Sequence, residues 1–290
     1  MHYVEVKGIL SAKNGLNLYR GCSHGCIYCD SRSSCYQMAH AFEDIEVKQN
    51  ALILLEEALR RKRKKCMIGT GSMTDPYIPL ETELGNVRQA MELVYKYGCG
   101  FTVLTKSNRI LRDLDLLQKI NAATKCVVQM TLTTWDEDLC KKIEPHVSTT
   151  RERFEVLKKL RDAGIPTIVW LAPILPFIND SEANLQGILD YCIEAGVYGI
   201  ICFGMGLTLR DGNREYFYQQ LDRHFPGLKK RYIDTYSNQY VIDSPNSKQL
   251  LQLLRQKCRQ HGIIQDNQQL FTYLSTFTNK QADRQQSLFE

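Results

Sequence analysis

The apolar residues of this chain follow two alternating spacings. In residues 51–60 the leucines recur at the three- and four-residue intervals of one helix face, and residues 66–69 then form a short apolar run that ends at a glycine. Residues 151–163 repeat the helical spacing, and Gly164 follows at a position where helices commonly end. These segments predict amphipathic helices that alternate with short buried strands.

The same alternation continues to about residue 204. Further helices are predicted over residues 83–97, 111–120 and 185–195, and strands over residues 17–19, 101–105, 126–133, 167–173 and 198–204. Apolar strands between helices are typical of a parallel sheet that helices cover. Six strand–helix units predict either an open doubly wound sheet or an incomplete barrel. In both folds, ligands bind at the C-terminal ends of the strands.

The pattern changes near residue 213. Beyond it, helical spacing over residues 215–223 and 247–261 is followed by a polar end. We therefore predict three parts: a core of residues 1–212, a helical C-terminal extension of residues 213–280, and a flexible tail of residues 281–290.

Composition narrows the class of protein. Hydrophobic residues make up 43% of the 290-residue chain, and its eleven cysteines are odd in number, unlike those of a small disulfide scaffold. The N-terminus lacks the regions of a signal peptide, and the longest apolar run, residues 165–178, is too short to span a bilayer. We expect a soluble cytoplasmic protein that does not enter a membrane. The basic run at residues 60–65 fits either a solvated helix end or a nucleic-acid contact.

Four cysteines lie close together near the start of the chain. Cys22, Cys26 and Cys29 have the spacing C-x3-C-x2-C, and Cys35 follows six residues later. Three thiolates on one loop can reach a single metal centre. A structural zinc site requires a fourth ligand, which His24 or Cys35 could supply, and a redox pair of Cys26 and Cys29 leaves Cys22 unexplained. A [4Fe–4S] cluster held by three cysteines leaves one iron open for chemistry.

The motif C-x3-C-x-Tyr-C after the first predicted strand resembles the signature of the radical S-adenosylmethionine enzymes. Further motifs, in order, resemble the spore photoproduct lyase-like branch of that family, often labelled DNA repair photolyase. They are GTGSMTDPY (69–77), VLTKSNRILRDLDLL (103–117), QMTLTTWDED (129–138) and EPHVSTTRERFEVLKKLRDAGIPTIVWLAPILPFIND (144–180). The resemblance implies an α/β fold, a partial (β/α)6 barrel with a helical C-terminal extension.

The resemblance also implies the cofactors and the first chemical step. One [4Fe–4S] cluster, reduced by an external flavodoxin- or ferredoxin-type donor, would transfer an electron to S-adenosylmethionine. The resulting 5′-deoxyadenosyl radical would abstract a hydrogen atom from the substrate, and such a radical needs a dry, closed site. For this branch the expected substrate is DNA or another nucleic acid.

Site residues follow from the same resemblance. Cys22, Cys26 and Cys29 are expected to bind the cluster. The residues expected to bind S-adenosylmethionine are Tyr28 and Ala172 at the adenine, Ser72, Thr74 and Asp75 at the amino group, Lys106 at the carboxylate, and Thr131 beside it. Glu144 and Arg153 also match recurring positions, where either a ligand contact or a structural ion pair fits.

One position departs from the branch. Spore photoproduct lyases carry a hydrogen-donating cysteine in the loop after the second strand, and Ser72 aligns with it here. Because the O–H bond of serine is too strong to return a hydrogen atom easily, cleavage of thymine dimers by the same route is not expected. Tyr77, Cys35 or a residue of the tail could serve instead.

The C-terminal segment Gln285-Gln-Ser-Leu-Phe289 resembles the peptide with which bacterial repair proteins bind the DNA sliding clamp. Gln285, Leu288 and Phe289 match this peptide, and Gln286 replaces its leucine. A polar tail that orders on binding suits such an interaction. Packing of the Leu–Phe pair back onto the barrel is the other interpretation.

A different class of function also fits the cysteine loop. The chain could be a non-catalytic nucleic-acid-binding or clamp-associated protein in which zinc or an iron–sulfur cluster only stabilises the loop. Formation of 5′-deoxyadenosine separates the two interpretations.

Overall fold

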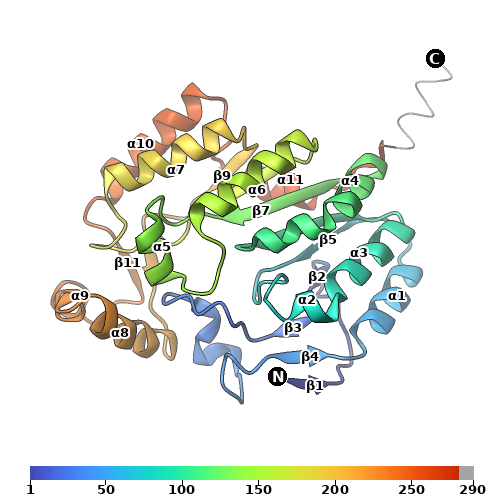
Figure 1. Cartoon of the computed structure of the whole chain (residues 1–290), viewed down its shortest axis with the longest axis horizontal. Helices are drawn as coiled ribbons and strands as arrows, with labels where there is room; N and C mark the ends of the chain where they lie inside the picture. The colour runs from blue at the N-terminus through green and yellow to red at the C-terminus, as the bar shows by residue number, and fades with distance from the viewer. Residues whose placement is uncertain (281–290) are drawn as a thin grey trace.

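The computed structural model describes residues 1–280. A six-stranded parallel sheet lies at its centre, in the order β2-β5-β6-β7-β8-β9 (Figure 1). The strands are β2 (Gly15–Leu16), β5 (Met67–Thr70), β6 (Gly100–Thr105), β7 (Cys126–Thr131), β8 (Thr167–Trp170) and β9 (Gly199–Ile201). Every neighbouring pair is parallel, and β2 and β9 do not pair with each other. The strand order follows the chain order, as in a barrel wound in one direction, and the two edge strands do not close it, so the sheet is an incomplete barrel, which confirms the predicted fold class.

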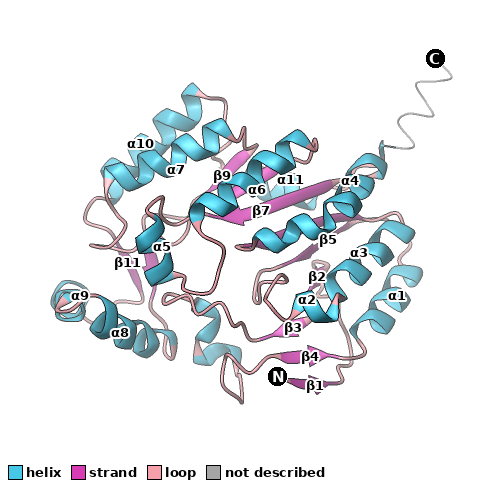
Figure 2. Ribbon diagram, in the orientation of Figure 1, coloured by secondary structure: helices cyan, strands magenta, loops and turns pink. Residues whose placement is uncertain are grey.

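Helices between the strands cover the outer face of this sheet (Figure 2). The α-helices are α1 (Ala51–Arg61), α2 (Glu81–Leu84), α3 (Asn86–Lys96), α4 (Leu114–Ala123), α5 (Glu137–Ile143), α6 (Thr150–Asp162) and α7 (Glu182–Glu194), and the 3-10 helices are η1 (Asp30–Arg32), η2 (Ser34–Tyr36) and η3 (Asn108–Asp113). The predicted helix over residues 83–97 is divided at Gly85, whose φ of +63° is easily adopted by glycine.

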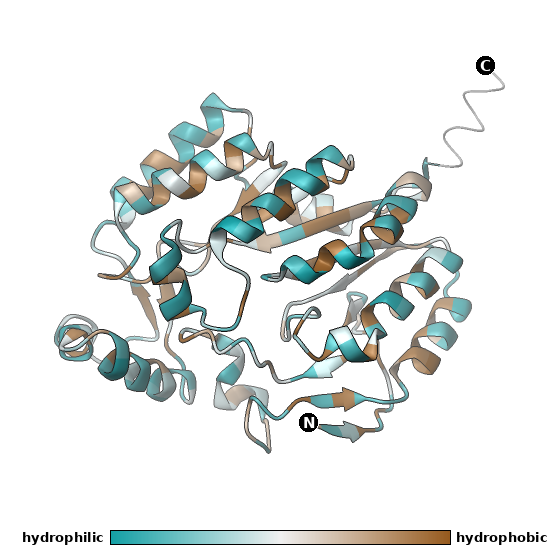
Figure 3. Cartoon of the chain, in the orientation of Figure 1, coloured by the Kyte–Doolittle hydropathy of each residue, from teal (hydrophilic) through white to brown (hydrophobic). Residues whose placement is uncertain are grey.

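The main core lies between the sheet and the helices. Figure 3 shows apolar strands and helices whose apolar sides face them. Leu55 of α1, Ile68 of β5, Val128 of β7 and Leu157 of α6 are all 0% exposed. Each such side chain contributes about 1.5–3 kcal/mol by leaving water, so burial of the helices fixes the sheet and the loops at its ends.

The region before α1 differs from the prediction. The expected strand over residues 17–19 is two short strands, because the chain leaves the barrel after β2 and joins a separate sheet in the order β1-β4-β3. That sheet comprises β1 (His2–Val4), β3 (Tyr19–Arg20) and β4 (Glu46–Lys48). The cysteine loop thus begins at β3, beside the barrel, and runs back across the strand ends.

The C-terminal part packs against the barrel. It comprises β10 (Gly206–Thr208), α8 (Asn213–His224), α9 (Leu228–Tyr236), β11 (Val241–Asp243), α10 (Ser247–Gln260) and α11 (Asn267–Ser275). Helical spacing predicted α8 and α10 but not α9, α11 or β11. Because β11 pairs antiparallel with β10, the predicted extension is not wholly helical, and a division at residue 212 stays a prediction.

Two further expectations concern the ends of the chain and the membrane. Within residues 1–280, no helix has both the length and the apolar character needed to cross a bilayer. The clamp-like motif with Gln285, Leu288 and Phe289 lies outside the described residues.

Candidate active site

A cavity of about 600 Å³ opens at the C-terminal ends of the strands. Its wall is formed by segments that follow nearly every barrel strand, together with β10 and β11. The lining residues include Cys22, His24, Cys26, Tyr28, Cys29, Asp30 and Ser31 of the cysteine loop, Gly71, Ser72, Met73 and Asp75 after β5, Leu104, Thr105 and Lys106 at the end of β6, Thr131 of β7, Trp170 at the end of β8, Ala172 and Pro173 after it, and Phe203 and Gly204 after β9. Its volume is in the range of small-molecule sites.

The cysteine loop is held in place by backbone hydrogen bonds at both ends. The Cys22 N–H donates to the Phe42 carbonyl at 2.9 Å, and the Ile27 N–H donates to the Ile143 carbonyl at 3.0 Å. After α5, the His146 N–H donates to the carbonyl of His24 at 3.2 Å. These contacts present Cys22, Cys26 and Cys29 to the cavity without regular secondary structure in between.

All three predicted cluster ligands line this cavity as free thiols. Burial raises the pKa of the Cys22 thiol to about 12 and raises that of Cys26 well above its ordinary value. The bare thiols of Cys22 and Cys26 are therefore protonated at neutral pH and are poor redox nucleophiles, whereas a cationic metal centre would stabilise their thiolates.

The spacing of the three sulfur atoms argues against a single zinc ion. Around one zinc ion at Zn–S of about 2.3 Å, tetrahedral geometry places the sulfurs about 3.8 Å apart. Within residues 1–280, the thiols of Cys22, Cys26 and Cys29 are not among the groups whose ligand atoms all lie within 4.8 Å of one another. A multi-iron cluster is wider than one ion and fits such spacing better.

The two proposed fourth zinc ligands differ in position. Cys35 is exposed and lies outside the cavity lining, where its thiol accepts from Arg210 Nη1 at 3.4 Å. His24 is 2% exposed and lines the cavity, with Nδ1 at 3.5 Å from Asp75 Oδ2. Its Nε2 is buried and has no hydrogen-bond partner. A buried polar atom of this kind is costly unless a ligand satisfies it.

Asp75 connects the loop after β5 to the end of β6. Its Oδ1 accepts from the Tyr77 N–H at 2.9 Å and from Thr105 Oγ1 at 2.7 Å, and its Oδ2 accepts from the Lys106 N–H at 2.7 Å. A carboxylate has about four acceptor positions, and the fourth lies towards His24 Nδ1, which is 3.5 Å from Oδ2. Gly71 lets the loop after β5 pass close to β6, because a Cβ on residue 71 would lie 2.0 Å from the Leu104 carbonyl oxygen.

Lys106 provides a positive charge in the cavity wall. Burial lowers the pKa of its ammonium, but the opposing charges of Cys26 as a thiolate, Glu144 and Asp75 outweigh burial and raise the pKa above its ordinary value. Its Nζ lies 5.8 Å from the centroid of the Tyr28 ring. The ammonium is thus fully charged at neutral pH, as a carboxylate-binding group must be.

Tyr28 is fixed by a buried ion pair. Its hydroxyl donates to Glu144, which pairs with Arg153, and both charged side chains are 0% exposed. Arg153 Nη1 also donates to the Thr131 carbonyl at 2.7 Å, at the end of β7. Glu144 and Arg153 do not line the cavity. They form a structural ion pair that positions Tyr28 and Thr131. Of the two interpretations left by the sequence, a ligand contact and a structural ion pair, the geometry favours the second.

The remaining predicted residues separate into two groups. Ser72, Thr131 and Ala172 line the cavity together with Tyr28, Asp75 and Lys106. Thr74 is buried at 5% exposure and is not part of the lining. The structure therefore brings all but one of the proposed cofactor-binding residues together, although their roles remain predictions.

The alternative hydrogen donors are placed less favourably. Tyr77 is 0% exposed, and its hydroxyl donates to Asp113 Oδ2 at 3.1 Å, away from the cavity lining. Cys35 faces a neighbouring depression with Arg210 and Tyr240. Neither is in direct contact with the cavity that the three cluster cysteines share.

The sequence reasoning did not identify the residues at the cavity mouth. Trp170, Phe203 and Arg210 all line the cavity, and Phe203 is 66% exposed. Trp170 and Phe203 lie within the predicted strands over residues 167–173 and 198–204, so their aromatic character near a strand end was the available signal. Arg210 carried no local signal, because only the fold of β10 and β11 brings it to the mouth.

These observations fit a metal cluster and a small cofactor bound side by side. The cavity presents three thiols, a charged ammonium and an unpartnered imidazole nitrogen on loops that other elements hold. The thiols suit iron of a cluster, and the ammonium suits a carboxylate group.

Comparison with known proteins agrees with this arrangement. The profile of the Radical SAM superfamily matches residues 16–186. An uncharacterised protein of Mycobacterium tuberculosis is 30% identical over 232 residues, which cover 76% of this chain and 66% of that protein. The chain thus spans slightly less than two thirds of this relative.

Two solved structures have the same fold. A variant of spore photoproduct lyase matches with a TM-score of 0.65 and 14% identity, over 90% of this chain and 78% of the lyase. Spore photoproduct lyase complexed with dinucleoside spore photoproduct matches with a TM-score of 0.61 and 16% identity, over 84% and 72% of the two chains. At this identity the likeness concerns the fold alone.

Proposed function

Because the chain belongs to the Radical SAM superfamily, we propose that it is an enzyme that cleaves S-adenosylmethionine reductively and acts on a base of a nucleic acid. The observation that carries the first part is the cavity itself, in which Cys22, Cys26 and Cys29 lie with Lys106 at the strand ends. When bound there, a [4Fe–4S] cluster supplies the electron that releases a 5′-deoxyadenosyl radical from the cofactor.

The protein's own residues bind and orient the cofactor. Lys106 would pair with its carboxylate, and the carboxylate of Asp75 in the cavity lining would receive its amino group in place of the 3.5 Å contact with His24. Tyr28, held by Glu144, would support the adenine from one side of the cavity. Ala172 and Thr131 complete the wall at the ends of β8 and β7. An external flavodoxin- or ferredoxin-type protein is the proposed electron donor.

The aromatic mouth supports a nucleobase as the substrate group. Phe203 and Phe271 are stacked with centroids 6.0 Å apart, and Trp170 lies 5.8 Å from Phe203 and 6.1 Å from Phe271. Phe203 and Phe271 are 66% and 40% exposed. Exposed aromatic faces beside a reaction cavity suit a base that is taken out of its stack.

Arg210 adds the charge that such a substrate requires. Its guanidinium lines the cavity and lies 5.5 Å from the centroid of the exposed Tyr240 ring. An ion pair of 3.4 Å with Asp30 and a hydrogen bond of 3.1 Å to the Tyr36 hydroxyl hold it at the mouth. A backbone phosphate could bind here while the neighbouring base stacks on Phe203.

The basic run at residues 60–65 is a weaker candidate for substrate contact. It connects α1 to the start of β5, and the cavity follows the other end of that strand. The charge near the cavity therefore comes from Lys106 and Arg210, and the solvated-helix-end interpretation is the better one for this run.

The substrate class is tested by anaerobic turnover of the reconstituted protein under dithionite. We expect a single-stranded oligonucleotide to accelerate 5′-deoxyadenosine formation and an unrelated peptide to have no effect. Phe203→Ala should abolish the acceleration but keep the basal rate, whereas Tyr95→Ala, a change at a 44% exposed tyrosine on α3, should keep both. Acceleration by peptide alone would contradict the nucleic-acid part, and no cleavage at all would favour a non-catalytic metal loop.

A further inference from the structure

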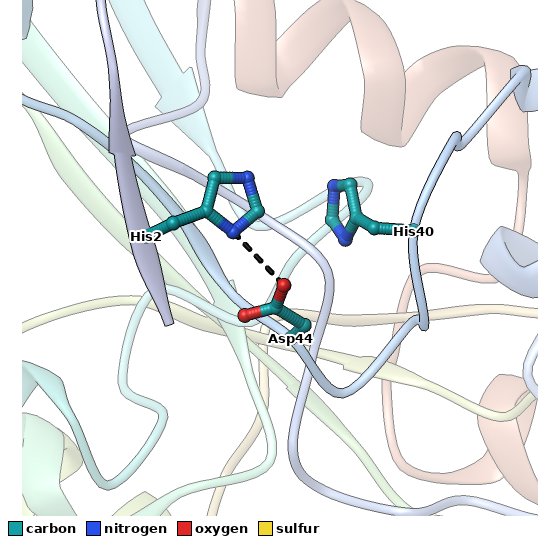
Figure 4. Close-up of side chains that lie close together, drawn as sticks. All are labelled: His2, His40 and Asp44. Atoms are coloured by element: carbon teal, nitrogen blue, oxygen red, sulfur yellow. Dashed lines mark hydrogen bonds and ion pairs between the residues drawn. The ribbon is translucent and has the colours of Figure 1, made fainter.

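A second group of metal-binding side chains lies outside the lining of the active-site cavity (Figure 4). The ligand atoms of His2, His40 and Asp44 all lie within 4.8 Å of one another, and within residues 1–280 no other group of three or more His, Cys, Asp or Glu side chains meets that condition. His2 Nδ1 is 2.9 Å from Asp44 Oδ2, and the two imidazole rings meet edge to face at 4.8 Å.

We propose that His2, His40 and Asp44 bind one divalent transition-metal ion of the Zn²⁺ class, independently of the iron–sulfur cluster. Two imidazoles and a carboxylate are a ligand set that such ions favour. Glu46 Oε1 lies 2.8 Å from His40 Nε2, although Glu46 is not among the three residues whose ligand atoms all converge. With two carboxylates nearby, the charge of the ion is balanced locally.

The orientation of His40 supports this assignment. Its Nδ1 lies 3.0 Å from the Ala41 carbonyl oxygen, which can only accept, so Nδ1 carries the proton of the neutral ring. Nε2 then presents a lone pair at 2.8 Å from Glu46 Oε1. Two lone-pair atoms so close require a proton or a metal ion between or beside them. A metal-binding histidine commonly donates its other N–H to a carbonyl, as His40 does.

Both oxygens of Asp44 have partners, and an ion would replace the contact between Oδ2 and His2. Its Oδ1 pairs with the amino group of Met1 at 3.0 Å, and its Oδ2 faces His2. His2, His40 and Asp44 are all half-buried, so the group is shielded from bulk water but open to an entering ion.

An ion at this point would join separate elements. His2 is on β1, which pairs parallel with β4 opposite Glu46, whereas His40 and Asp44 are on the loop before β4. The same loop provides the Phe42 carbonyl that accepts from the Cys22 N–H. The ion would therefore stabilise the loop on which the first cluster cysteine rests.

The site is tested on the cluster-loaded protein, because bare thiols would also bind zinc. After anaerobic dialysis against micromolar Zn²⁺, we expect one zinc per chain in the wild type and in His261→Ala, a change at an exposed histidine at the end of α10. We expect less than a tenth of an equivalent in His40→Gln and in Asp44→Asn. No zinc in the wild type, or unchanged zinc in both variants, would overturn the site.

Two further measurements test the ligand set of the site and its stabilising role one at a time. Co²⁺ bound in place of zinc should show weak visible bands without the near-ultraviolet bands of thiolate ligands, and thiolate bands would overturn the ligand set. Zinc should slow the release of cluster iron to a chelator at least severalfold in the wild type but not in His40→Gln. Equal iron release with and without zinc would overturn the stabilising role of the ion.

Discussion

The Tyr28–Glu144–Arg153 group and the Tyr19–Glu81–Arg112 group are built from the same three residue types. In each, a tyrosine hydroxyl and an arginine bind one buried glutamate. In the first, Tyr28 lines the cavity and the arginine holds the end of β7.

The second group has no part in the cavity. Tyr19 of β3, Glu81 of α2 and Arg112 of η3 join three elements, and none of the three lines the cavity. Glu81 also accepts from the Val87 N–H at 3.0 Å. The comparison shows that residue types alone do not separate a site from its scaffold. The position of a group relative to the strand ends does separate them. Matched substitutions in the two groups measure how far their effects on stability and on cofactor binding differ.

The largest difference is expected between Glu144→Gln and Glu81→Gln. The first leaves Arg153, which is 0% exposed, without its carboxylate, and breaking a buried pair costs about 3–5 kcal/mol of unfolding free energy. Arg112 is 33% exposed and keeps Asp113 as a partner, so the second change should cost about 1–3 kcal/mol. Anaerobic urea unfolding followed by circular dichroism measures both. A larger loss for Glu81→Gln would contradict the comparison.

A smaller difference is expected between Tyr28→Phe and Tyr19→Phe. Each change removes one hydrogen bond to a carboxylate and should cost about 1.5–3 kcal/mol of stability. Only Tyr28→Phe frees a ring in the cavity wall, so only it should weaken binding of S-adenosylmethionine, by about fivefold, or about 1 kcal/mol. Equilibrium dialysis of the cluster-loaded variants measures this affinity. An equal effect of Tyr19→Phe would remove the distinction between site and scaffold.

The smallest expected effect is on the pH dependence of stability, and it concerns Lys125, a buried cation whose hydrogen-bond partners are carbonyls and not a carboxylate. Lys125 donates to the carbonyls of Tyr273 and Thr276, and burial, together with the nearby charge of Lys280, lowers the pKa of its ammonium to about 8. Between pH 8 and an unfolded-state pKa of about 10.4, the unfolded chain binds more protons at this lysine than the folded chain. Stability should therefore rise with pH in this window.

Lys125→Met provides the control for that prediction. The variant lacks the titrating group, so the difference in unfolding free energy between wild type and variant should change in favour of the wild type from pH 7.5 to pH 10. Urea unfolding at several pH values measures this difference. A constant difference across the range would show that the ammonium of Lys125 is not destabilised by burial.

Much of this architecture could be predicted because it depends on local pattern. Apolar runs of four to six residues gave β5, β6 and β7, since a buried parallel strand requires apolar side chains on both faces. The cysteine spacing predicted the metal-binding loop for a similar reason, because short loops fix which thiols can meet. The C-terminal ends of the predicted strands also indicate where the cavity lies, because ligands bind at that end of both candidate folds.

The rest depends on contacts between distant segments. Tyr28 and Glu144 are 116 residues apart, and no pattern in one sequence shows that they bind each other. The two- and three-residue strands β2, β10 and β11 are too short to have a periodic signal, yet β10 and β11 place Arg210 at the mouth. The helix α11 was missed because its polar residues outnumber the buried Leu270 and Leu274 that pack against the sheet.

The central claim is that Cys22, Cys26 and Cys29 together hold a cluster that cleaves S-adenosylmethionine. It is tested most directly by 5′-deoxyadenosine formation under dithionite in Cys26→Ala and Cys35→Ala, two variants from the same cysteine-rich region. The account predicts about four irons per chain and normal cleavage in Cys35→Ala, because Cys35 lies outside the cavity. It predicts depleted iron and no detectable 5′-deoxyadenosine in Cys26→Ala. Cleavage that survives in Cys26→Ala and is lost in Cys35→Ala would contradict it.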